Sequence, residues 1–214
     1  EEIKEQMVPA QENTYASNWL YASAGSNHTV AIKIDGTLWG WSNNYFGNLG
    51  DGTNTEISQA IQEATKASDW IDVSAGRYHT MAKKSDGTLW LWGSNEYSQL
   101  GDGTETNANV PIQENSLSSN WNSISAGNVQ SMATKDDGTL WGWGSAERVL
   151  GRDNARSGPT QEFTEGTEWS KVSSTSGHIM VIDKDNTLWG WGDSTHGEVG
   201  NGSYQHRRYH PVQI

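Results

Sequence analysis

Tryptophan recurs at fixed intervals along the whole chain, and this recurrence strongly restricts the folds that the chain can adopt. Four units open on single tryptophans spaced by 51, 51 and 48 residues, which are Trp19, Trp70, Trp121 and Trp169. In each unit a pair of tryptophans follows at one fixed offset, the pairs being Trp39/Trp41, Trp90/Trp92, Trp141/Trp143 and Trp189/Trp191. These positions account for all 12 tryptophans. Because a period of ~40–50 residues is typical of propeller blades and solenoid turns, we expect an array of similar units.

Each unit has the pattern of four strands. The first strand ends in small residues, such as the Ser-Ala-Gly of residues 23–25, which suit a strand crowded near an axis. The second and third strands flank a two-residue turn such as the Asp-Gly of residues 35–36, a pair that tolerates the positive φ of a type I′ hairpin. Neighbouring registers of the second strand are both apolar, as at Met81 and Ala82, so we expect both of its faces to be covered. The fourth strand is short and marked by Gln.

Three strings recur in the units: Ser-Ala-Gly-x-x-His-Thr, Asp-Gly-Thr-Leu-Trp-Gly-Trp-Gly and Leu-Gly-Asp-Gly-Thr. Over residues 8–214 they resemble the repeat of the regulator-of-chromosome-condensation (alpha-tubulin-suppressor-like) family. The resemblance implies an all-β fold, a β-propeller made of four-stranded antiparallel blades. It implies no single activity, because the family includes an exchange factor for a small GTPase, an enzyme inhibitor and a plant light receptor.

The repeats divide the chain into five segments. Residues 12–62, 63–113, 114–161 and 162–214 form repeats 1 to 4, and residues 1–11 end in Val-Pro-Ala-Gln, the pattern of the last strand of a preceding blade. Rings of the family that the chain resembles usually close with seven blades, whereas four are marked by tryptophan. We therefore expect a segment of a larger ring or a ring completed by homo-oligomerisation.

Composition excludes several classes of partner and chemistry. The chain has 14 Lys and Arg against 26 Asp and Glu, a formal net charge of −12, which repels nucleic acid and anionic lipid. It contains no cysteine, so thiolate catalysis and Cys-based zinc sites are excluded. No apolar run reaches the ~18 residues that span a bilayer, so we expect no membrane insertion. We also expect no cofactor.

A residue that recurs in the same register of every repeat is expected to be structural, whereas a site residue should be unique to its copy. His28, His79 and His178 share one register, which favours hydrogen bonds between blades over catalysis. Asp51 lies in a Leu-Gly-Asp-Gly-Thr turn that lacks the ligand spacing of a calcium loop. The tryptophans recur as well, so we expect all of them to pack in the core. No catalytic or metal-ligating residue is predicted.

The loop between the third and fourth strands differs between copies and is where we expect a ligand to bind, since loops on a rigid scaffold carry recognition. Its candidate binding residues are Tyr45, Phe46, Glu96, Tyr97, Arg148, Arg152, Arg156 and His196. The last copy adds a basic and aromatic cluster of Tyr204, His206, Arg207, Arg208 and Tyr209. Tyr and Arg are preferred interface residues. The alternative is that these loops are merely solvated and tolerant of change.

The sequence favours a non-enzymatic module of bacterial or phage origin that presents variable rim loops to a protein or glycan ligand. An extracellular location, or one on a cell or virion surface, fits this expectation. One alternative is a regulator that resembles the exchange factor and acts on a small GTPase. The other is a carbohydrate-active enzyme, a glycosidase or lyase, which would need unique carboxylates or histidines grouped on one rim.

Overall fold

The computed structural model describes residues 17–145, 156–162, 168–204 and 208–214, and these contain sixteen strands and no helix. The strands form four antiparallel sheets in which they are ordered as they occur in the chain. Sheet 1 consists of β1 (Trp19–Ala24), β2 (His28–Lys33), β3 (Leu38–Ser42) and β4 (Ile57–Gln62). Sheet 2 consists of β5 (Trp70–Ala75), β6 (His79–Lys84), β7 (Leu89–Gly93) and β8 (Ala108–Gln113).

The other two sheets repeat this order. Sheet 3 consists of β9 (Trp121–Ala126), β10 (Gln130–Lys135), β11 (Leu140–Gly144) and β12 (Arg156–Gln161). Sheet 4 consists of β13 (Trp169–Ser174), β14 (His178–Asp183), β15 (Leu188–Gly192) and β16 (Arg208–Gln213). The expectation of a short fourth strand is wrong, because β4 has six residues and β3 has five.

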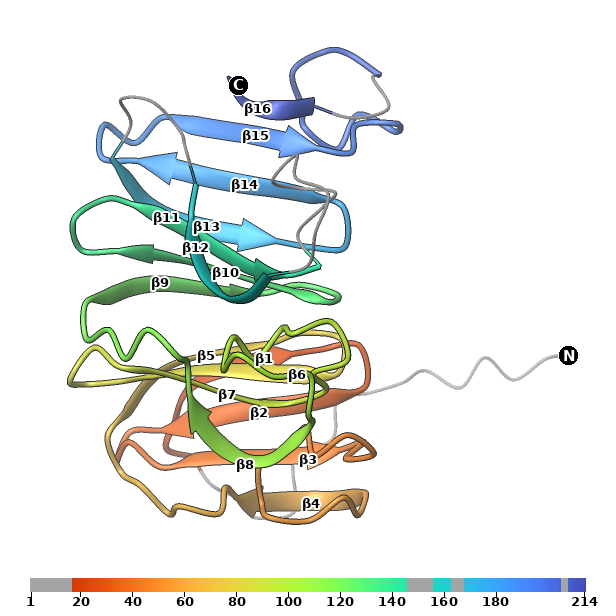
Figure 1. Ribbon diagram of the computed structural model, residues 1–214. Coiled ribbons are helices and arrows are strands. Elements are labelled where there is room, and N and C mark those ends of the chain that lie inside the picture. The colour runs from red at the N-terminus through yellow and green to blue at the C-terminus, as the bar shows by residue number, and fades with distance from the viewer. Residues whose placement is uncertain (1–16, 146–155, 163–167, 205–207) are drawn as a thin grey trace, which may run out of the picture.

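The sheets fan around a common centre as the blades of a β-propeller do. In Figure 1 the first strands β1, β5, β9 and β13 lie towards the middle of the molecule, while β4 and β16 lie at its lower and upper extremes. Each first strand packs against the first strand of the next sheet, and β5, β9 and β13 also contact the second strand of the sheet before them. The expected fold, a β-propeller of four-stranded antiparallel blades, is therefore confirmed.

The turns between second and third strands differ from the expected type. Among the turn residues, φ is positive at Gly36, Gly87, Gly138 and Asn186 but not at the preceding Asp. A type I′ turn requires positive φ at both central residues, so the prediction of that type is wrong. The Gly36 N–H donates to the Lys33 carbonyl and the Lys33 N–H donates to the Thr37 carbonyl, both at 2.9 Å. This pattern is a type I turn followed by a left-handed glycine that forms a bulge.

The core lies between neighbouring sheets. We call the face of a sheet that packs on the following sheet its forward face, and the opposite one its backward face. Between sheets 1 and 2, the forward face supplies Val30, Ile32 and Leu38, and the backward face supplies Trp70, Val73, Ala82 and Trp92. The second strands of sheets 2 and 3 are buried on both faces, as the adjacent apolar registers predict.

Only half of the tryptophans are fully buried. Exposure does not exceed 2% for Trp70, Trp92, Trp121, Trp143, Trp169 and Trp191. The other six are half-buried, so the expectation that all twelve pack in the core is too broad. In sheets 1 to 3 the first Trp of the pair and the opening Trp flank a lysine ammonium, and the Lys135 Nζ lies 4.0 Å from the Trp141 ring centre and 4.5 Å from that of Trp121.

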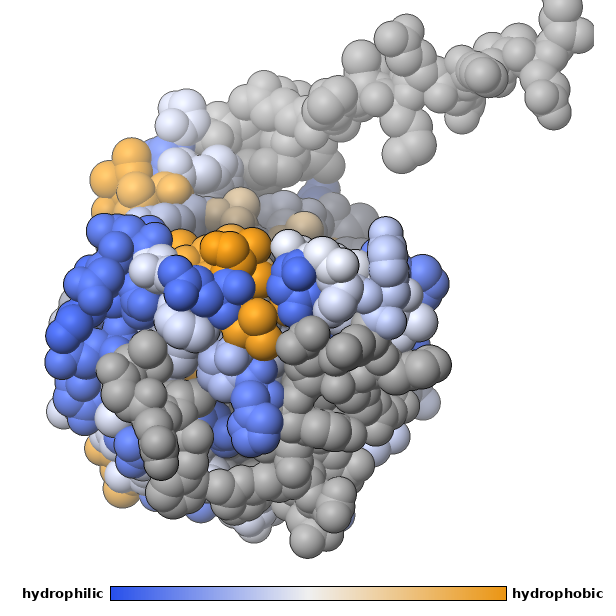
Figure 2. Space-filling view, turned by 90° about the horizontal axis from the view of Figure 1, so that it is seen from above, coloured by the Kyte–Doolittle hydropathy of each residue, from blue (hydrophilic) through white to orange (hydrophobic). Residues whose placement is uncertain are grey.

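Within the described residues, the outermost sheets each have one face that no other sheet covers. The backward face of sheet 1 carries Trp19 and Trp41, both half-buried. On sheet 4, Leu188 is 39% exposed, whereas Leu38, Leu89 and Leu140 in the same register are at most 1% exposed. Figure 2 looks onto the side where sheet 4 lies and shows apolar patches among polar residues. The preceding-blade strand expected in residues 1–11 lies outside the described residues.

Candidate functional site

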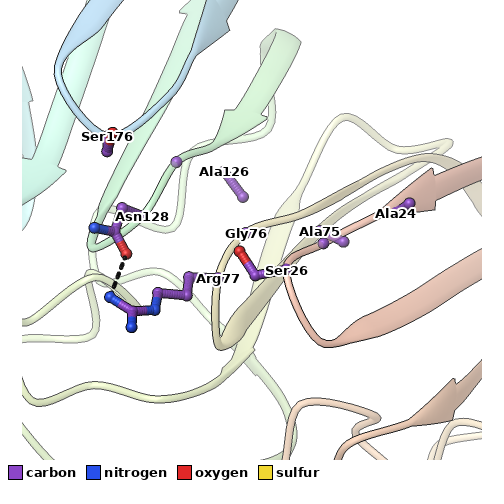
Figure 3. Close-up of a pocket in the computed structure, with 10 residues that line it drawn as sticks. Ala24, Ser26, Ala75, Gly76, Arg77, Ala126, Asn128 and Ser176 are labelled. Carbon is purple, nitrogen blue, oxygen red and sulfur yellow. Dashed lines mark hydrogen bonds between the residues drawn. The ribbon is translucent and has the colours of Figure 1, made fainter.

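A hollow lies near the centre of the propeller, where the first strands of sheets 1 to 3 end. Its wall is formed by the ends of these strands and the loops that follow them, at Ala24–Ser26, Ala75–Arg77 and Ala126–Asn128, with Ser176 from sheet 4. In Figure 3 the labelled side chains come from four successive sheets, and Arg77 points towards Asn128. The Arg77 Nη1 donates to the Asn128 Oδ1 at 3.4 Å. The repeated small residues thus leave room at the centre, and the loops place polar groups around it.

A second hollow of about 370 Å³ adjoins the first and shares Arg77, Asn128 and Ser176 with it. Its other walls are residues of the third-to-fourth-strand loops and of the loops after β5 and β9, which are Phe46, Tyr78, Ser94, Glu96, Tyr97, Val129 and Ser145. The two hollows therefore form one continuous rim surface, which we call the central rim.

Aromatic side chains from two sheets form a row along the central rim. The Phe46 ring lies 5.0 Å from the Tyr45 ring and 5.1 Å from the Tyr78 ring, measured between centroids. The Arg77 guanidinium continues the row, with its Cζ 5.0 Å from the Tyr78 ring centre. Tyr45 is 74% exposed and Tyr97 is 48% exposed. A row of this kind can stack on a flat apolar group or a sugar ring and can bind a carboxylate through the guanidinium.

Only some of the residues that were expected to bind a ligand lie at the central rim. Phe46, Glu96 and Tyr97 line the rim hollow, and Tyr45 makes an edge-to-face contact with Phe46 beside it. His196 and Tyr204 are exposed on the β15–β16 loop, and neither lines either hollow.

The remaining candidates cannot be placed. Arg148, Arg152, His206 and Arg207 lie outside the described residues. Arg156 begins β12 and Arg208 begins β16, where their backbones pair with Gly144 and Gly192, and Tyr209 follows in β16, but the side chains of all three are outside the description. Their proposed role stays a prediction.

Sequence reasoning missed four residues of the rim: Arg77, Tyr78, Asn128 and Ser176. The criterion that a site residue should be unique to its repeat would have found two of them. Arg77 and Tyr78 replace Ser26 and Asn27 of the first copy and are therefore unique to their repeat. They lie beside the recurring histidine, whereas the candidate binding residues were sought in the loop between the third and fourth strands. Their proximity to Asn128 depends on the curvature of the array, which no local pattern states.

Two of the three recurring histidines, His28 and His79, make structural contacts between sheets. The His28 Nε2 lies 2.9 Å from the Thr80 Oγ1, and the Thr80 hydroxyl donates to the Asn48 carbonyl at 2.8 Å. Because that hydroxyl proton is used, the imidazole must donate from Nε2 and leave its buried Nδ1 without a partner. Burial lowers the pKa of His28 to about 4.

His79 repeats this arrangement with Ser131 of sheet 3, and burial together with the nearby His28 lowers the pKa of His79 to about 3. Both imidazoles are neutral at physiological pH and bridge neighbouring sheets.

Carboxylates in the recurring turns are structural too. Asp51 accepts hydrogen bonds from the Asn44 side chain and from the Thr53 N–H, each at 3.0 Å, as a turn residue does. In the described part of the chain, no group of three or more His, Asp or Glu is arranged to hold a metal ion. The same part contains no helix long and apolar enough to cross a membrane.

The fold and the central rim define a repeat propeller with a rigid frame and a variable rim. Two models, both described as the regulator of chromosome condensation (RCC1) repeat, match residues 86–134 and residues 22–48, 70–99 and 169–198, which together cover more than half of the chain. The chain belongs to the RCC1 repeat family.

Curated relatives share the repeat over part of their length. The chain is 35% identical over 125 residues to the ultraviolet-B receptor UVR8 of Arabidopsis thaliana, a match covering 57% of this chain and 28% of the receptor. It is 34% identical over 127 residues to the probable E3 ubiquitin-protein ligase HERC6 of Homo sapiens, covering 58% of this chain and 12% of HERC6. The matched region is therefore less than a third of either relative.

Solved structures show the same fold at low identity. Prp20p of Saccharomyces cerevisiae superposes with a TM-score of 0.82 and 19% identity, covering 96% of this chain and 52% of Prp20p. Human WBSCR16 gives a TM-score of 0.81 and 18% identity, covering 92% of this chain and 52% of WBSCR16. The chain thus corresponds to about half of each of these propellers.

Proposed function

We propose that the protein is a non-enzymatic binding scaffold whose central rim recognises a protein or glycan ligand. The row of Tyr45, Phe46, Tyr78 and Arg77 beside the rim hollow supports this proposal. Tyr45, Tyr78 and Arg77 do not recur in the other repeats, so the four-stranded frame does not require them. The register of Phe46 is aromatic again in repeat 2, where Tyr97 occupies it. Exposed aromatic and Arg side chains on a rigid frame bind at low ordering cost.

The chemistry of the rim favours a ligand that offers an apolar or sugar face together with an acidic group. The aromatic row supplies stacking surface, and Arg77 supplies a guanidinium in a chain of net charge −12. Asn128 and Ser176 supply neutral hydrogen-bonding groups beside it. The structure of Prp20p is described with binding to Gsp1p and histones, which supports a protein ligand in a related propeller.

The experiment compares ligand capture by rim variants of equal stability. An array of glycans and a library of peptides would be probed with the 214-residue chain, with Arg77→Ser plus Tyr97→Ser, and with Ile34→Ser as control. Ile34 is 68% exposed and follows the end of β2, at the opposite rim. We expect the double rim variant to lose ~10-fold or more in affinity while the control binds normally.

The melting temperatures of the three proteins should agree, because both rim residues are exposed. Equal capture by the double variant and the parent chain would remove the central rim from consideration. An acidic ligand should also lose affinity as salt is raised, since the guanidinium contributes a screened attraction.

A further inference from the structure

The junctions between sheets 1 and 2 and between sheets 2 and 3 are closed by the same polar contacts. A forward-face histidine meets a hydroxyl on the next sheet: the His28 Nε2 lies 2.9 Å from the Thr80 Oγ1, and the His79 Nε2 lies 3.1 Å from the Ser131 Oγ. On the backward face, an indole N–H donates to a carbonyl of the preceding sheet. The Trp92 Nε1 donates to the Asn48 carbonyl at 2.9 Å.

A third contact recurs near the central axis. The Ala75 N–H donates to the Ser23 hydroxyl at 2.9 Å, and the Ala126 N–H donates to the Ser74 hydroxyl at 2.9 Å. In both cases the serine belongs to the preceding sheet. These two junctions therefore combine a His, a Ser and a carbonyl on the forward face with a hydroxyl, an indole and an N–H on the backward face.

The junction between sheets 3 and 4 shows that the two halves are matched as a pair. Sheet 4 has Ile179 in the hydroxyl register, and sheet 3 has Gln130 in the histidine register. The Gln130 amide donates to the Thr175 carbonyl. Where the next sheet lacks the hydroxyl, the imidazole is thus replaced by a side chain that reaches another acceptor. A histidine in this register is therefore matched to a hydroxyl opposite it.

The two outermost faces carry complementary halves of one more junction. On sheet 4, His178 and Ser173 keep the forward registers, and the Ser173 hydroxyl has no hydrogen bond to the described residues. On sheet 1, Thr29 keeps the hydroxyl register and Trp41 keeps the indole register, and neither side chain hydrogen bonds to the described part of the chain.

On the backward face of sheet 1, two tryptophan rings already have the arrangement that equivalent rings have where another sheet packs on this face. The Trp19 and Trp41 rings lie 6.2 Å apart at 58°, and the equivalent rings of Trp70 and Trp92 lie 6.0 Å apart at 62°. Opposite this face, a filled junction needs apolar side chains. Sheet 4 offers Leu188, which is 39% exposed although Leu89 in its register is fully buried.

From these matched halves we propose that the forward face of sheet 4 binds the backward face of sheet 1 of a second copy of the chain. The contact repeats the pattern of the junctions between sheets 1 and 2 and between sheets 2 and 3, with His178 meeting the partner's Thr29 and Ser173 meeting the partner's Ala24 N–H. The indole of the partner's Trp41 donates to the Glu198 carbonyl, which has the register of the Asn48 carbonyl. Because the chain has four described sheets, two copies joined at both ends form a closed dimer of eight sheets, one more than the seven blades with which rings of the family usually close.

The test uses the 214-residue chain and two variants that place a charge on one face each. Leu188→Glu alters the forward face of sheet 4, and Ala22→Lys alters the backward face of sheet 1, where Ala22 is exposed and has the register of Val73. Sedimentation velocity over a range of concentrations should give a dimer for the parent chain. Each variant alone should weaken the dimer ~10-fold or more, while Leu117→Glu, at a 67% exposed position between β8 and β9 of the inner sheets, should leave it unchanged.

Mixing the two variants tests the head-to-tail arrangement. A heterodimer has one unaltered junction and one in which Glu faces Lys, so the mixture should dimerise more tightly than either variant alone. A parent chain that stays monomeric at high micromolar concentration would overturn the proposal. A dimer that neither variant weakens, or a mixture no tighter than its components, would also overturn it. Circular dichroism should show the same folded sheet content in every variant.

Discussion

At the scale of single residues, the buried histidines illustrate how the propeller joins its sheets without charge. His79 is fully buried and donates towards Ser131 while its Nδ1 has no partner. Its glycine neighbour is required, since a Cβ on Gly76 would lie 2.6 Å from the carbonyl oxygen of Gly127 and 2.6 Å from the His79 ring. A protonated imidazole would bring an unpaired charge into this space, so burial favours the neutral form.

The lowered histidine pKa values predict how stability depends on pH. The pKa of His79 is about 3 and that of His28 about 4 in the folded protein, against 6.5 when unfolded. Below pH 6.5 the unfolded chain binds protons that the folded chain does not, so the free energy of unfolding is highest above that pH and falls as pH drops towards 4. Each histidine contributes a slope of up to about 1.4 kcal/mol per pH unit in this window.

His79→Gln should flatten this dependence, because glutamine does not titrate and already occupies the register as Gln130. Urea unfolding at pH 7.0 and 5.5 measures the two slopes. The window lies above the range where most carboxylates titrate, so their contribution is small. An unchanged slope in the variant would show that the histidine is not the proton acceptor.

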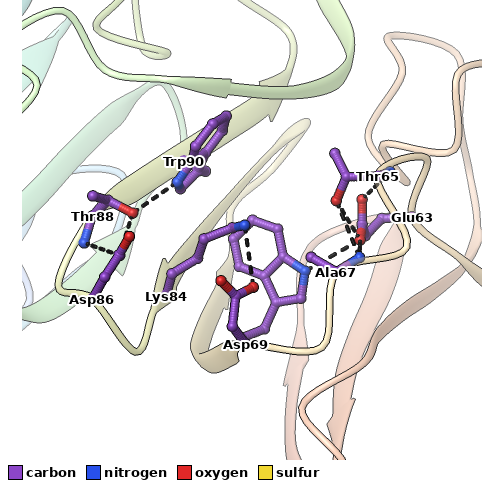
Figure 4. A network of polar contacts seen from close by, with 9 residues as sticks. Glu63, Thr65, Ala67, Asp69, Lys84, Asp86, Thr88 and Trp90 are labelled. Atoms are coloured by element: carbon purple, nitrogen blue, oxygen red, sulfur yellow. Dashed lines mark hydrogen bonds and ion pairs between the residues drawn. The ribbon is translucent and has the colours of Figure 1, made fainter.

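At the scale of the strand and turn, the four hairpins share one backbone conformation, but the aspartate that accepts the turn's hydrogen bonds lies at one of two different positions. In sheets 1 to 3 the turn aspartate accepts from the Thr two residues on, as at Asp86, which accepts from the Thr88 N–H at 3.0 Å and from its hydroxyl at 2.6 Å. Figure 4 shows this group next to Trp90, whose indole N–H donates to the Thr88 hydroxyl. The Thr88 hydrogen bonds lower the pKa of Asp86.

In the hairpin of sheet 4, the aspartate that accepts these hydrogen bonds is Asp183, two residues before the turn position Asp185. Asp183 accepts from the Thr187 N–H at 2.8 Å and from the Trp189 indole at 2.9 Å. It occupies the register of Lys135, so sheet 4 has no lysine between its tryptophans. The turn residue Asp185 is exposed, and its side chain makes no hydrogen bond in the described structure.

This difference predicts unequal effects of the same substitution. Asp86→Ala should lower the free energy of unfolding by about 1 kcal/mol, because the Thr88 N–H and hydroxyl lose their acceptor. Asp185→Ala should change it by less than about 0.5 kcal/mol, as a surface substitution does. The midpoints of urea unfolding compare the two variants. Equal losses would contradict the assignment of the turn role to Asp183.

How far the sequence predicts this structure can be judged from the same elements. Trp spacing and the Asp-Gly pairs were sufficient to place the strands, because the four copies supply the same evidence four times. The turn type was not predictable, since both candidate turns use a left-handed glycine such as Gly36. The loops around Phe46 and Tyr97 were identified by their divergence. Their meeting with Arg77 was not, because it depends on how far one sheet rotates from the next.

At the scale of the whole molecule, stability follows the number of covered faces. Sheets 2 and 3 are packed between neighbours, whereas sheets 1 and 4 each have one outer face that no sheet of the described residues covers. In a repeat array each unit is stabilised by its own strands and by contact with its neighbours. Opening the outer sheets therefore costs one junction, and opening an inner sheet costs two.

Hydrogen exchange should show this order directly. At a concentration where the chain is monomeric, amides of β6 and β10 should exchange most slowly and amides of β2 and β14 faster, although all four are second strands. Exchange followed by mass spectrometry of peptides resolves the four sheets. Uniform protection across them would indicate that the chain opens only as a whole.

In sheet 3, Gln130 replaces the histidine of the recurring register and faces Ile179 of sheet 4, and this replacement limits how the gene can change. Tandem repeats are prone to lose a unit by recombination between copies. Deleting the third unit here would bring His79 against Ile179, which has no hydroxyl to accept the imidazole N–H. A buried donor without an acceptor costs about 1–3 kcal/mol. The units look interchangeable in the printed sequence, yet Gln130 and Ile179 are matched only when unit 4 follows unit 3. The product of a shortened gene would therefore need a second mutation to regain its stability.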